Sequence, residues 1–81
     1  MKYYVYVLTS KKFPERCYVG ITKNLKERIK DHNSGESSYS KKYGPWELRT
    51  SISFKNRNKA EEFEKYLKSG SGFSFLKKRL I

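Results

Sequence analysis

The alternation of hydrophobic and polar positions predicts three strands separated by helical segments. Tyr3–Leu8 carries β-branched and aromatic residues on both of its faces, which predicts a strand buried on both sides. A second strand is expected over 16–22, joined to the first by a polar loop of about six residues. Gly20 interrupts that strand, which indicates a bulge or a place where backbone or ligand comes close. Between Trp46 and Phe54 apolar and polar residues alternate, so this segment predicts an amphipathic strand with one apolar face.

Capping residues mark a helix after the second strand. Asn24 is a good N-cap, and Glu27 three residues later approximates a capping box, so we expect a helix from Leu25 to about Asn33. Ser34 and Gly35 end it. Residues 34–45 are polar and contain glycine and serine, which predicts a long loop that can move.

Two further helices are expected after the third strand. Asn58 is the expected cap of a helix over 59–68, which stops at Ser69 and Gly70. A short helix with a basic end is expected over 71–81. The fold class is therefore α+β, and the whole chain, 1–81, is expected to form one small domain.

The charge balance narrows the class of partner. The chain has 19 Lys and Arg against 8 Asp and Glu, a net charge of +11, and 16% of its residues are aromatic. That many aromatic residues exclude a disordered basic tail, and the positive charge favours nucleic acid over an anionic membrane surface as the partner. The single cysteine, the lack of a secretory signal pattern and the lack of a long apolar run lead us to expect a cytoplasmic protein without a membrane segment.

Three titratable residues fall on helix faces that should be apolar. Because residues i, i+3, i+4 and i+7 share a helix face, Arg28 and His32 lie on the inward stripe of the first helix and Glu64 lies on that of the second. An unpaired buried charge is costly. These residues therefore either pair with one another or converge with tyrosine hydroxyls on a shared cleft.

Several segments resemble a known family. Tyr4-Val5-Tyr6 and Tyr18-Val19-Gly20 are similar to the two tripeptides of the GIY-YIG nuclease signature, with Tyr4 in place of the first glycine. The stretch 20–35 and the helix 60–68 also resemble family motifs, so the likeness extends over residues 3–80. The chain is thus similar to small single-domain bacterial GIY-YIG proteins, to the catalytic domain of the excinuclease C subunit and to stand-alone structure-specific endonucleases.

The resemblance implies a three-stranded antiparallel sheet flanked by helices, in the order β-β-α-β-α-α. It implies a metal-dependent endonuclease that hydrolyses DNA phosphodiester bonds. Cutting would be directed by structure or damage rather than by base sequence, in DNA repair, recombination or processing. Such a cassette would act alone or on a partner protein that supplies specificity. The alternative is a nucleic-acid-binding module of the same fold without activity.

The resemblance also implies roles for five residues. Tyr6, Tyr18, Arg28, His32 and Glu64 match the catalytic positions, and Glu64 is the expected ligand of one Mg²⁺ or Mn²⁺. Arg28 would neutralise charge on the phosphate. Tyr6 is hypothesised as the general base if a neighbouring cation lowers its pKa, with Tyr18 or His32 as alternatives.

A basic rim is expected around these segments. Its proposed DNA-binding members are Lys23, Lys26, Lys30, Lys41, Lys42, Arg57, Lys77 and Lys78. Tyr39, Tyr43 and Trp46 are expected to be available for stacking on an unpaired base.

Overall fold

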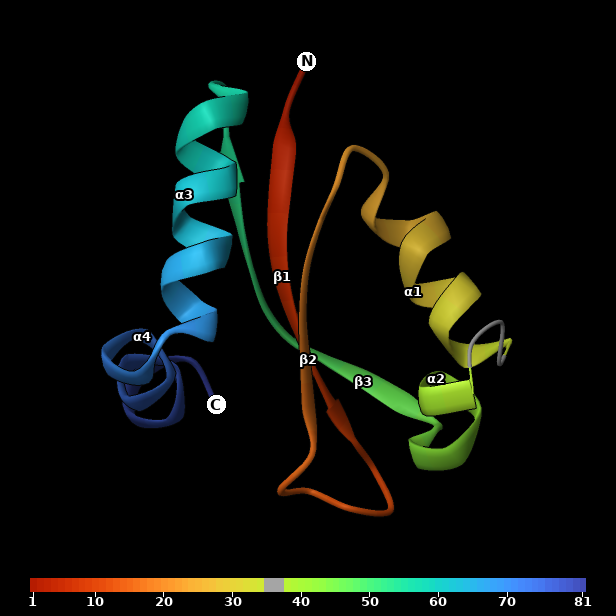
Figure 1. The fold of residues 1–81 in the computed structure, drawn as a ribbon. Coiled ribbons are helices and arrows are strands. Elements are labelled where there is room, and N and C mark those ends of the chain that lie inside the picture. Colours follow the sequence, from red (N-terminus) through yellow and green to blue (C-terminus); the bar gives the residue numbers. More distant parts are fainter. Residues whose placement is uncertain (35–37) are drawn as a thin grey trace.

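A computed structural model describes residues 1–34 and 38–81 and confirms the α+β class. Its elements are β1 (Tyr3–Ser10), β2 (Cys17–Thr22), α1 (Leu25–Asn33), α2 (Ser38–Tyr43), β3 (Trp46–Phe54), α3 (Arg57–Lys68), α4 (Gly70–Phe75) and the π-helical segment η1 (Leu76–Leu80). The strands form an antiparallel sheet in the order β2-β1-β3 (Figure 1). The three-stranded antiparallel sheet flanked by helices is therefore as expected, with one additional short helix before β3.

The central strand β1 is the most buried element. Every residue from Val5 to Ser10 is buried, because β1 has a strand on each edge and helices on each face. The strand continues two residues beyond the predicted end at Leu8. Since successive side chains of a strand point to opposite faces, β1 supplies both halves of the core.

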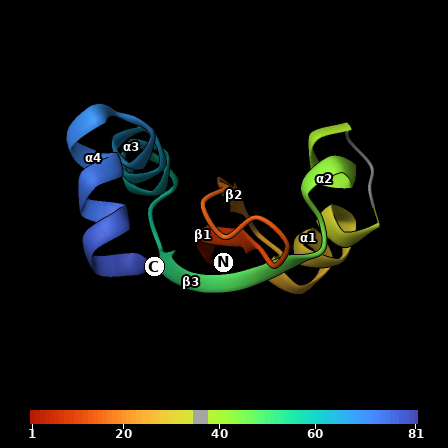
Figure 2. The same ribbon diagram turned by 90° about the horizontal axis from the view of Figure 1, so that it is seen from below.

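The helices divide between the two faces of the sheet (Figures 1 and 2). On the α3 face, Val5 and Val7 pack with Ala60 and Leu67 of α3 and with Leu76. On the α1 face, Tyr6, Leu8 and Trp46 form the buried cluster, and side chains of α1 pack against it. In the described part of the chain, no helix is both long and apolar enough to cross a membrane.

A register shift in β3 overturns the expectation of one apolar face along that strand. Val7 is paired with Thr50 but Leu8 with Leu48, so Arg49 is an extra residue that bulges out of the pairing. Trp46 therefore packs on the α1 face, whereas Phe54 packs on the α3 face. The strand bounds were predicted correctly, but a one-residue insertion exchanges the two faces of a strand.

The first helix begins and ends as predicted. The Asn24 side chain accepts a hydrogen bond from the Glu27 backbone N–H (3.1 Å), and its amide donates to the Glu27 carboxylate (3.2 Å). Ser34 is the C-cap. Gly35, the other expected terminator, lies outside the described residues.

The prediction of a continuous loop over 34–45 is wrong for residues 38–43, which form α2. Two long-range hydrogen bonds hold this short helix in place. The Ser40 hydroxyl lies 3.0 Å from Nδ1 of His32, and the Ser40 carbonyl accepts from Nε1 of Trp46 (3.1 Å). The partners lie in α1 and β3, so no local pattern around residues 38–43 could indicate them.

The helix α3 begins two residues earlier than predicted, and its cap is Asn56 rather than Asn58. The Asn56 side chain accepts from the Lys59 backbone N–H (3.1 Å), while Asn58 lies within the first turn. Both positions carry asparagine, and the extended backbone of Asn56 makes it the cap. The predicted stop is confirmed, since Ser69 ends α3 and caps α4 by accepting from Gly72 N–H (3.2 Å).

Candidate active site

The centre of the site is the Tyr6 hydroxyl, which lies against Gly20. The two residues are paired across β1 and β2. The Tyr6 ring covers the Gly20 Cα so closely that a Cβ at Gly20 would lie 2.6 Å from Tyr6 Cζ and closer still to its oxygen. The expected close approach at Gly20 is therefore confirmed, and its cause is the protein's own tyrosine. Lacking a side chain, Gly20 leaves room for the hydroxyl of Tyr6 over the edge strand β2.

His32 holds this hydroxyl from α1. Its Nε2 lies 3.2 Å from Tyr6 Oη, and its Nδ1 lies 3.0 Å from Ser40 Oγ. The side chain is buried, and burial together with the positive charge of Arg28 lowers the pKa of His32 below its usual value. The imidazole is therefore neutral at pH 7, with one nitrogen able to donate and the other able to accept.

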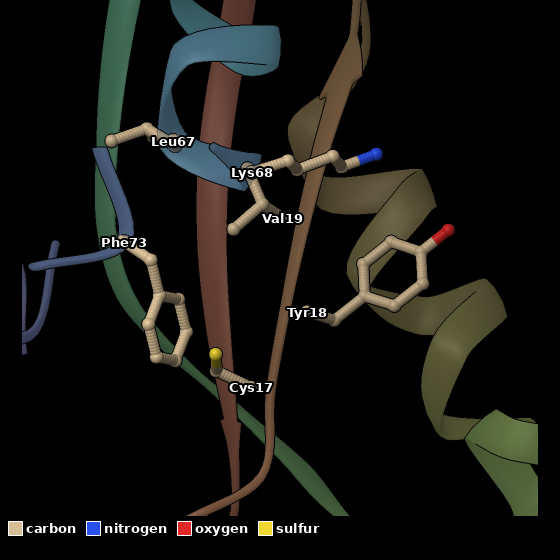
Figure 3. Close-up of a pocket in the computed structure, with 6 residues that line it drawn as sticks. All are labelled: Cys17, Tyr18, Val19, Leu67, Lys68 and Phe73. Atoms are coloured by element: carbon tan, nitrogen blue, oxygen red, sulfur yellow. The ribbon is translucent and has the colours of Figure 1, made fainter. Parts of the chain in front are cut away.

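Tyr18 lies beside this pair on the same face of the sheet. Its ring stacks with that of Tyr6 at a centroid distance of 6.4 Å and lies 4.4 Å from the His32 ring. Figure 3 shows the Tyr18 side chain directed toward the α1 side of β2. Tyr6 is 1% exposed and Tyr18 is partly exposed, so Tyr18 is the more accessible of the two hydroxyl-bearing rings.

Arg28 is placed differently from the expectation. It is exposed rather than buried on the inward stripe of α1. Its position one turn before His32 still lets its charge act on both Tyr6 and His32. It lines a polar hollow of about 440 Å³ together with Lys23, Glu27 and Asp31. An arginine in the rim of such a hollow can reach an anion without the cost of burial.

Glu64 is the carboxylate that α3 contributes. Its side chain is 20% exposed, which confirms a mostly inward orientation, and it accepts a hydrogen bond from Nζ of Lys68 one turn later (3.1 Å). Its negative charge raises the pKa of Tyr6, whereas the positive charge of Arg28 lowers it. The structure thus brings Tyr6, Tyr18 and His32 into direct contact, and Arg28 and Glu64 surround them from two different helices.

The expected lowering of the Tyr6 pKa is not found. Burial raises the pKa of Tyr6 to about 12, and the opposing effect of the Arg28 charge is smaller. The hydroxyl is consequently neutral across the physiological range. A cation next to a tyrosine does not suffice when the ring is almost wholly desolvated.

The residues at the site fit one hard divalent cation. Mg²⁺ retains several waters and needs only one or two protein carboxylates along with substrate oxygens. Glu64 is such an oxygen donor, and within the described residues no group of three His, Cys, Asp or Glu side chains forms a complete metal cage. Since the Glu64 carboxylate already accepts from Lys68 through one oxygen, a metal would share or compete for that carboxylate.

The eight basic residues expected to bind DNA are all exposed, but they lie on separate elements. Lys23 lines the same hollow as Arg28 and shares a second one, of 200 Å³, with Arg57. The other members lie on α1 (Lys26 and Lys30), α2 (Lys41 and Lys42) and η1 (Lys77 and Lys78). Of the eight, Lys23 is the one that shares a hollow with Arg28.

The expected stacking residues are not arranged for that purpose. Trp46 is 2% exposed and lies in the α1-face core, so it cannot stack on a base. Tyr43 packs edge-on against Phe13 and has Arg16 over its ring at 4.7 Å. The side chain of Tyr39 lies outside the described part of the structure.

One residue of the site and one ion pair were not predicted from the sequence. Ser40 bonds to His32, and nothing in the local pattern distinguishes it from neighbouring serines. The Glu64–Lys68 pair was detectable in principle, because glutamate and lysine four residues apart on a helix can pair.

Comparison with known proteins agrees with this fold. The profile of the GIY-YIG catalytic domain matches residues 2–78. A UPF0213 protein of Clostridium perfringens is 41% identical over 66 residues, which cover 80% of this chain and 69% of that protein. The solution NMR structure of a UPF0213 protein from Bacillus halodurans superimposes with a TM-score of 0.57 at 32% identity, covering 94% of this chain and 82% of that one.

Some similar proteins are much longer. A homolog of the structure-specific endonuclease subunit SLX1 from Giardia intestinalis is 40% identical over 48 residues, which cover 56% of this chain and 13% of that protein. The corresponding homolog from Drosophila persimilis is 39% identical over 71 residues, covering 76% of this chain and 24% of that protein. This chain therefore spans about an eighth to a quarter of these SLX1 homologs.

Proposed function

From the premise that this chain belongs to the GIY-YIG nuclease family, we propose that it is a metal-dependent endonuclease that hydrolyses DNA phosphodiester bonds. The observation that carries the proposal is the placement of the Tyr6 hydroxyl. It lies over Gly20, within hydrogen-bonding distance of a neutral His32 and in the electrostatic field of both Arg28 and Glu64. Phosphodiester hydrolysis needs groups that transfer a proton, a cation that binds the phosphate and a carboxylate that can hold a metal ion.

Arg28 is suited to bind the scissile phosphate. It is exposed and lines a hollow with Lys23, so a phosphate can approach without disturbing the core. The guanidinium offers two parallel donors to two phosphate oxygens. It would hold the phosphate and neutralise the charge that builds up during in-line attack.

Tyr6 and His32 can move a proton as a pair. With a pKa of about 12, Tyr6 does not act as a standing phenolate at pH 7. In the tautomer in which Nδ1 of His32 donates to Ser40, its Nε2 accepts from Tyr6 Oη. Tyr6 can then take a proton from the attacking water while giving its own to His32. Tyr18 or His32 acting directly on the water are the alternatives, and the greater exposure of Tyr18 favours the first of them.

Glu64 would hold the metal ion. A Mg²⁺ or Mn²⁺ held there would supply positive charge that stabilises the developing negative charge of the reaction. Lys68 would compete with the metal, because its ammonium group lies 3.1 Å from an oxygen of the same carboxylate.

The substrate is proposed to be recognised by its structure and backbone. The basic side chains are exposed and distributed over several elements, which suits phosphate contacts more than the reading of base edges. Two of the similar proteins are named as structure-specific endonuclease subunits. Action on branched or damaged DNA, during repair or recombination and with a partner protein, follows as the finer part of the proposal.

Nicking of supercoiled plasmid and of branched DNA tests the proposal. Wild-type protein is incubated with and without Mg²⁺ or Mn²⁺, next to Glu64→Gln and Arg28→Ala. Glu62→Gln is the matched control, because Glu62 lies on the same helix with a side chain 71% exposed. We expect metal-dependent nicking that Glu64→Gln and Arg28→Ala abolish and Glu62→Gln leaves intact.

Two outcomes would count against the assignment. Nicking that Glu64→Gln does not change would overturn the metal site. Salt-dependent DNA binding without nicking of either substrate would support the alternative, a binding module without activity.

A further inference from the structure

A groove lies between the free edge of β2 and the helices α3 and α4, next to the site just described. It has a volume of 420 Å³, and its lining residues are Cys17, Tyr18, Val19, Leu67, Lys68 and Phe73. Figure 3 shows Cys17, Val19, Leu67 and Phe73 gathered on the α3 side of β2. Its size falls within the range of about 300–1,000 Å³ that is usual for sites that bind small organic groups.

The walls of the groove combine an apolar floor with an exposed aromatic ring. Val19 and Leu67 are buried, whereas Phe73 is 44% exposed. A phenylalanine ring that remains this exposed on a small domain offers a flat surface on which a planar group can stack. The core clusters of the two faces do not include Phe73.

Positive charge surrounds this ring. Nζ of Lys77 lies 5.4 Å from the centre of the Phe73 ring, and Lys68 lines the groove. Lysines in contact with an apolar groove suit a ligand that carries a planar apolar part and an anionic part together. A nucleotide has that composition, with its base and its phosphate.

The groove is continuous with the candidate active site. Lys68 lines the groove and at the same time donates to Glu64, the proposed metal ligand. Tyr18 lines the groove and stacks with Tyr6 on the other face of β2. In Figure 3 the Lys68 side chain crosses in front of β2 from the groove toward the side of Tyr18. A group bound in the groove is therefore a near neighbour of the reacting phosphate.

We infer that the groove binds an unpaired nucleotide of the DNA substrate, with its base stacked on Phe73 and its phosphate contacting Lys68 and Lys77. The inference rests on the proposed endonuclease function and names the feature of the DNA that it recognises. A base can leave the duplex to enter such a groove most easily where it is already unpaired. The groove would thereby select DNA with a flap, bulge or mismatch beside the bond to be cut.

The test uses a duplex with one unpaired 2-aminopurine and the same duplex fully paired, both without divalent metal so that no cutting occurs. Movement of the unpaired 2-aminopurine out of the DNA stack and onto Phe73 should raise its fluorescence, because the neighbouring bases that quench it are left behind. The only cysteine of the chain provides a second readout. Alkylation of Cys17 at about pH 8.5, near the ordinary pKa of a thiol, should become slower with the unpaired duplex than with the paired one.

Substitutions of Phe73 test whether the unpaired base stacks on its ring. Phe73→Ala should weaken binding of the unpaired duplex between about 5-fold and about 150-fold, the range that stacking one base on an aromatic side chain is worth, and should leave the paired duplex unchanged. Phe73→Trp should restore binding. Phe75→Ala is the matched control, since Phe75 lies on the same helix with 37% exposure and does not line the groove.

The possible outcomes distinguish failure of the groove assignment from failure of the proposed endonuclease function. Equal affinity of wild type and Phe73→Ala for the two duplexes, with metal-dependent nicking intact, would overturn the groove assignment alone. Nicking that fails for every substrate would overturn the proposed function. Protection of Cys17 by a peptide or protein but by neither duplex would assign the groove to a protein partner and refute the inference.

Discussion

Replacing Gly20 by alanine tests whether the close approach of Tyr6 organises the site. The backbone of Gly20 is outside the left-handed region that favours glycine. An alanine there would ordinarily stabilise the protein by about 0.4–1 kcal/mol, because the unfolded chain becomes less free. The new Cβ, however, would lie 2.6 Å from Tyr6 Cζ. The clash with Tyr6, rather than the backbone preference of glycine, therefore determines whether Gly20→Ala stabilises or destabilises the protein.

The size of the destabilisation by Gly20→Ala depends on the packing and the hydrogen bond that Tyr6 would lose. Its side chain is 1% exposed, so the ring has no free volume into which it can move. Overpacking of this kind costs about 1–3 kcal/mol. Separating the Tyr6 hydroxyl from buried His32 adds about 1–3 kcal/mol for unsatisfied polar groups. After subtraction of the backbone term we expect Gly20→Ala to lower the free energy of unfolding by about 1–5 kcal/mol, with a central value of about 3 kcal/mol.

The assay is urea denaturation followed by the fluorescence of Trp46, the single tryptophan of the chain. Gly70→Ala is the matched control. Nothing lies within 4 Å of a Cβ at Gly70, which is exposed at the start of α4, so the free energy of unfolding should stay equal or rise by up to about 1 kcal/mol. In a Tyr6→Phe background the nearest clashing atom is gone, and Gly20→Ala should cost less. Equal effects of Gly20→Ala and Gly70→Ala would refute the account of the Tyr6–Gly20 contact.

Three further predictions concern other parts of the site and fold. Because burial raises the folded-state pKa of Tyr6 to about 12 from 10.0, the stability due to Tyr6 should be complete below pH 10 and lost as the pH rises from 10 to about 12. Tyr6→Phe should flatten that fall in urea denaturation across the same range, and an unchanged slope would contradict the shift. Lys68→Met should tighten Mn²⁺ binding by up to about 5-fold, which is the contribution of a partly exposed ion pair, and Glu64→Gln should abolish Mn²⁺ binding. The EPR signal of free Mn²⁺ measures both effects. Weaker Mn²⁺ binding by Lys68→Met would show that Lys68 does not compete with the metal. Asn56→Ala should lower the free energy of unfolding by about 1 kcal/mol through loss of the helix cap, and Asn58→Ala should lower it by less than about 0.5 kcal/mol. The reverse order in thermal unfolding would show that Asn58 is the cap.

The parts of the site that share one element were predictable from the sequence. Glu64 faces inward on α3, and His32 is buried on α1, as helical spacing predicted. Gly20 marks a close approach, as a glycine within a strand suggested. Arg28 shares the helical stripe of His32 but is exposed, although Leu25 and Ile29 of the same stripe pack against the core.

What the sequence by itself determined is the set of local elements: the strand bounds within two residues and the helix α1 with its Asn24 cap. Such features depend on residues a few positions apart, so periodicity and capping chemistry predict them. The tertiary structure decided which face of the sheet Trp46 and Phe54 occupy, because that follows from a one-residue bulge opposite β1.

The tertiary structure also decided the helix α2, the pKa of Tyr6 and the groove beside β2. Each depends on contacts between segments that are distant in the chain: Ser40 with His32, Tyr6 with Gly20 and His32, and Cys17 with Phe73 of α4. Burial and pairing of this kind arise only when the helices close over the sheet. The sequence therefore indicated the candidate side chains, and the tertiary structure determined their burial, their contacts and the groove beside them.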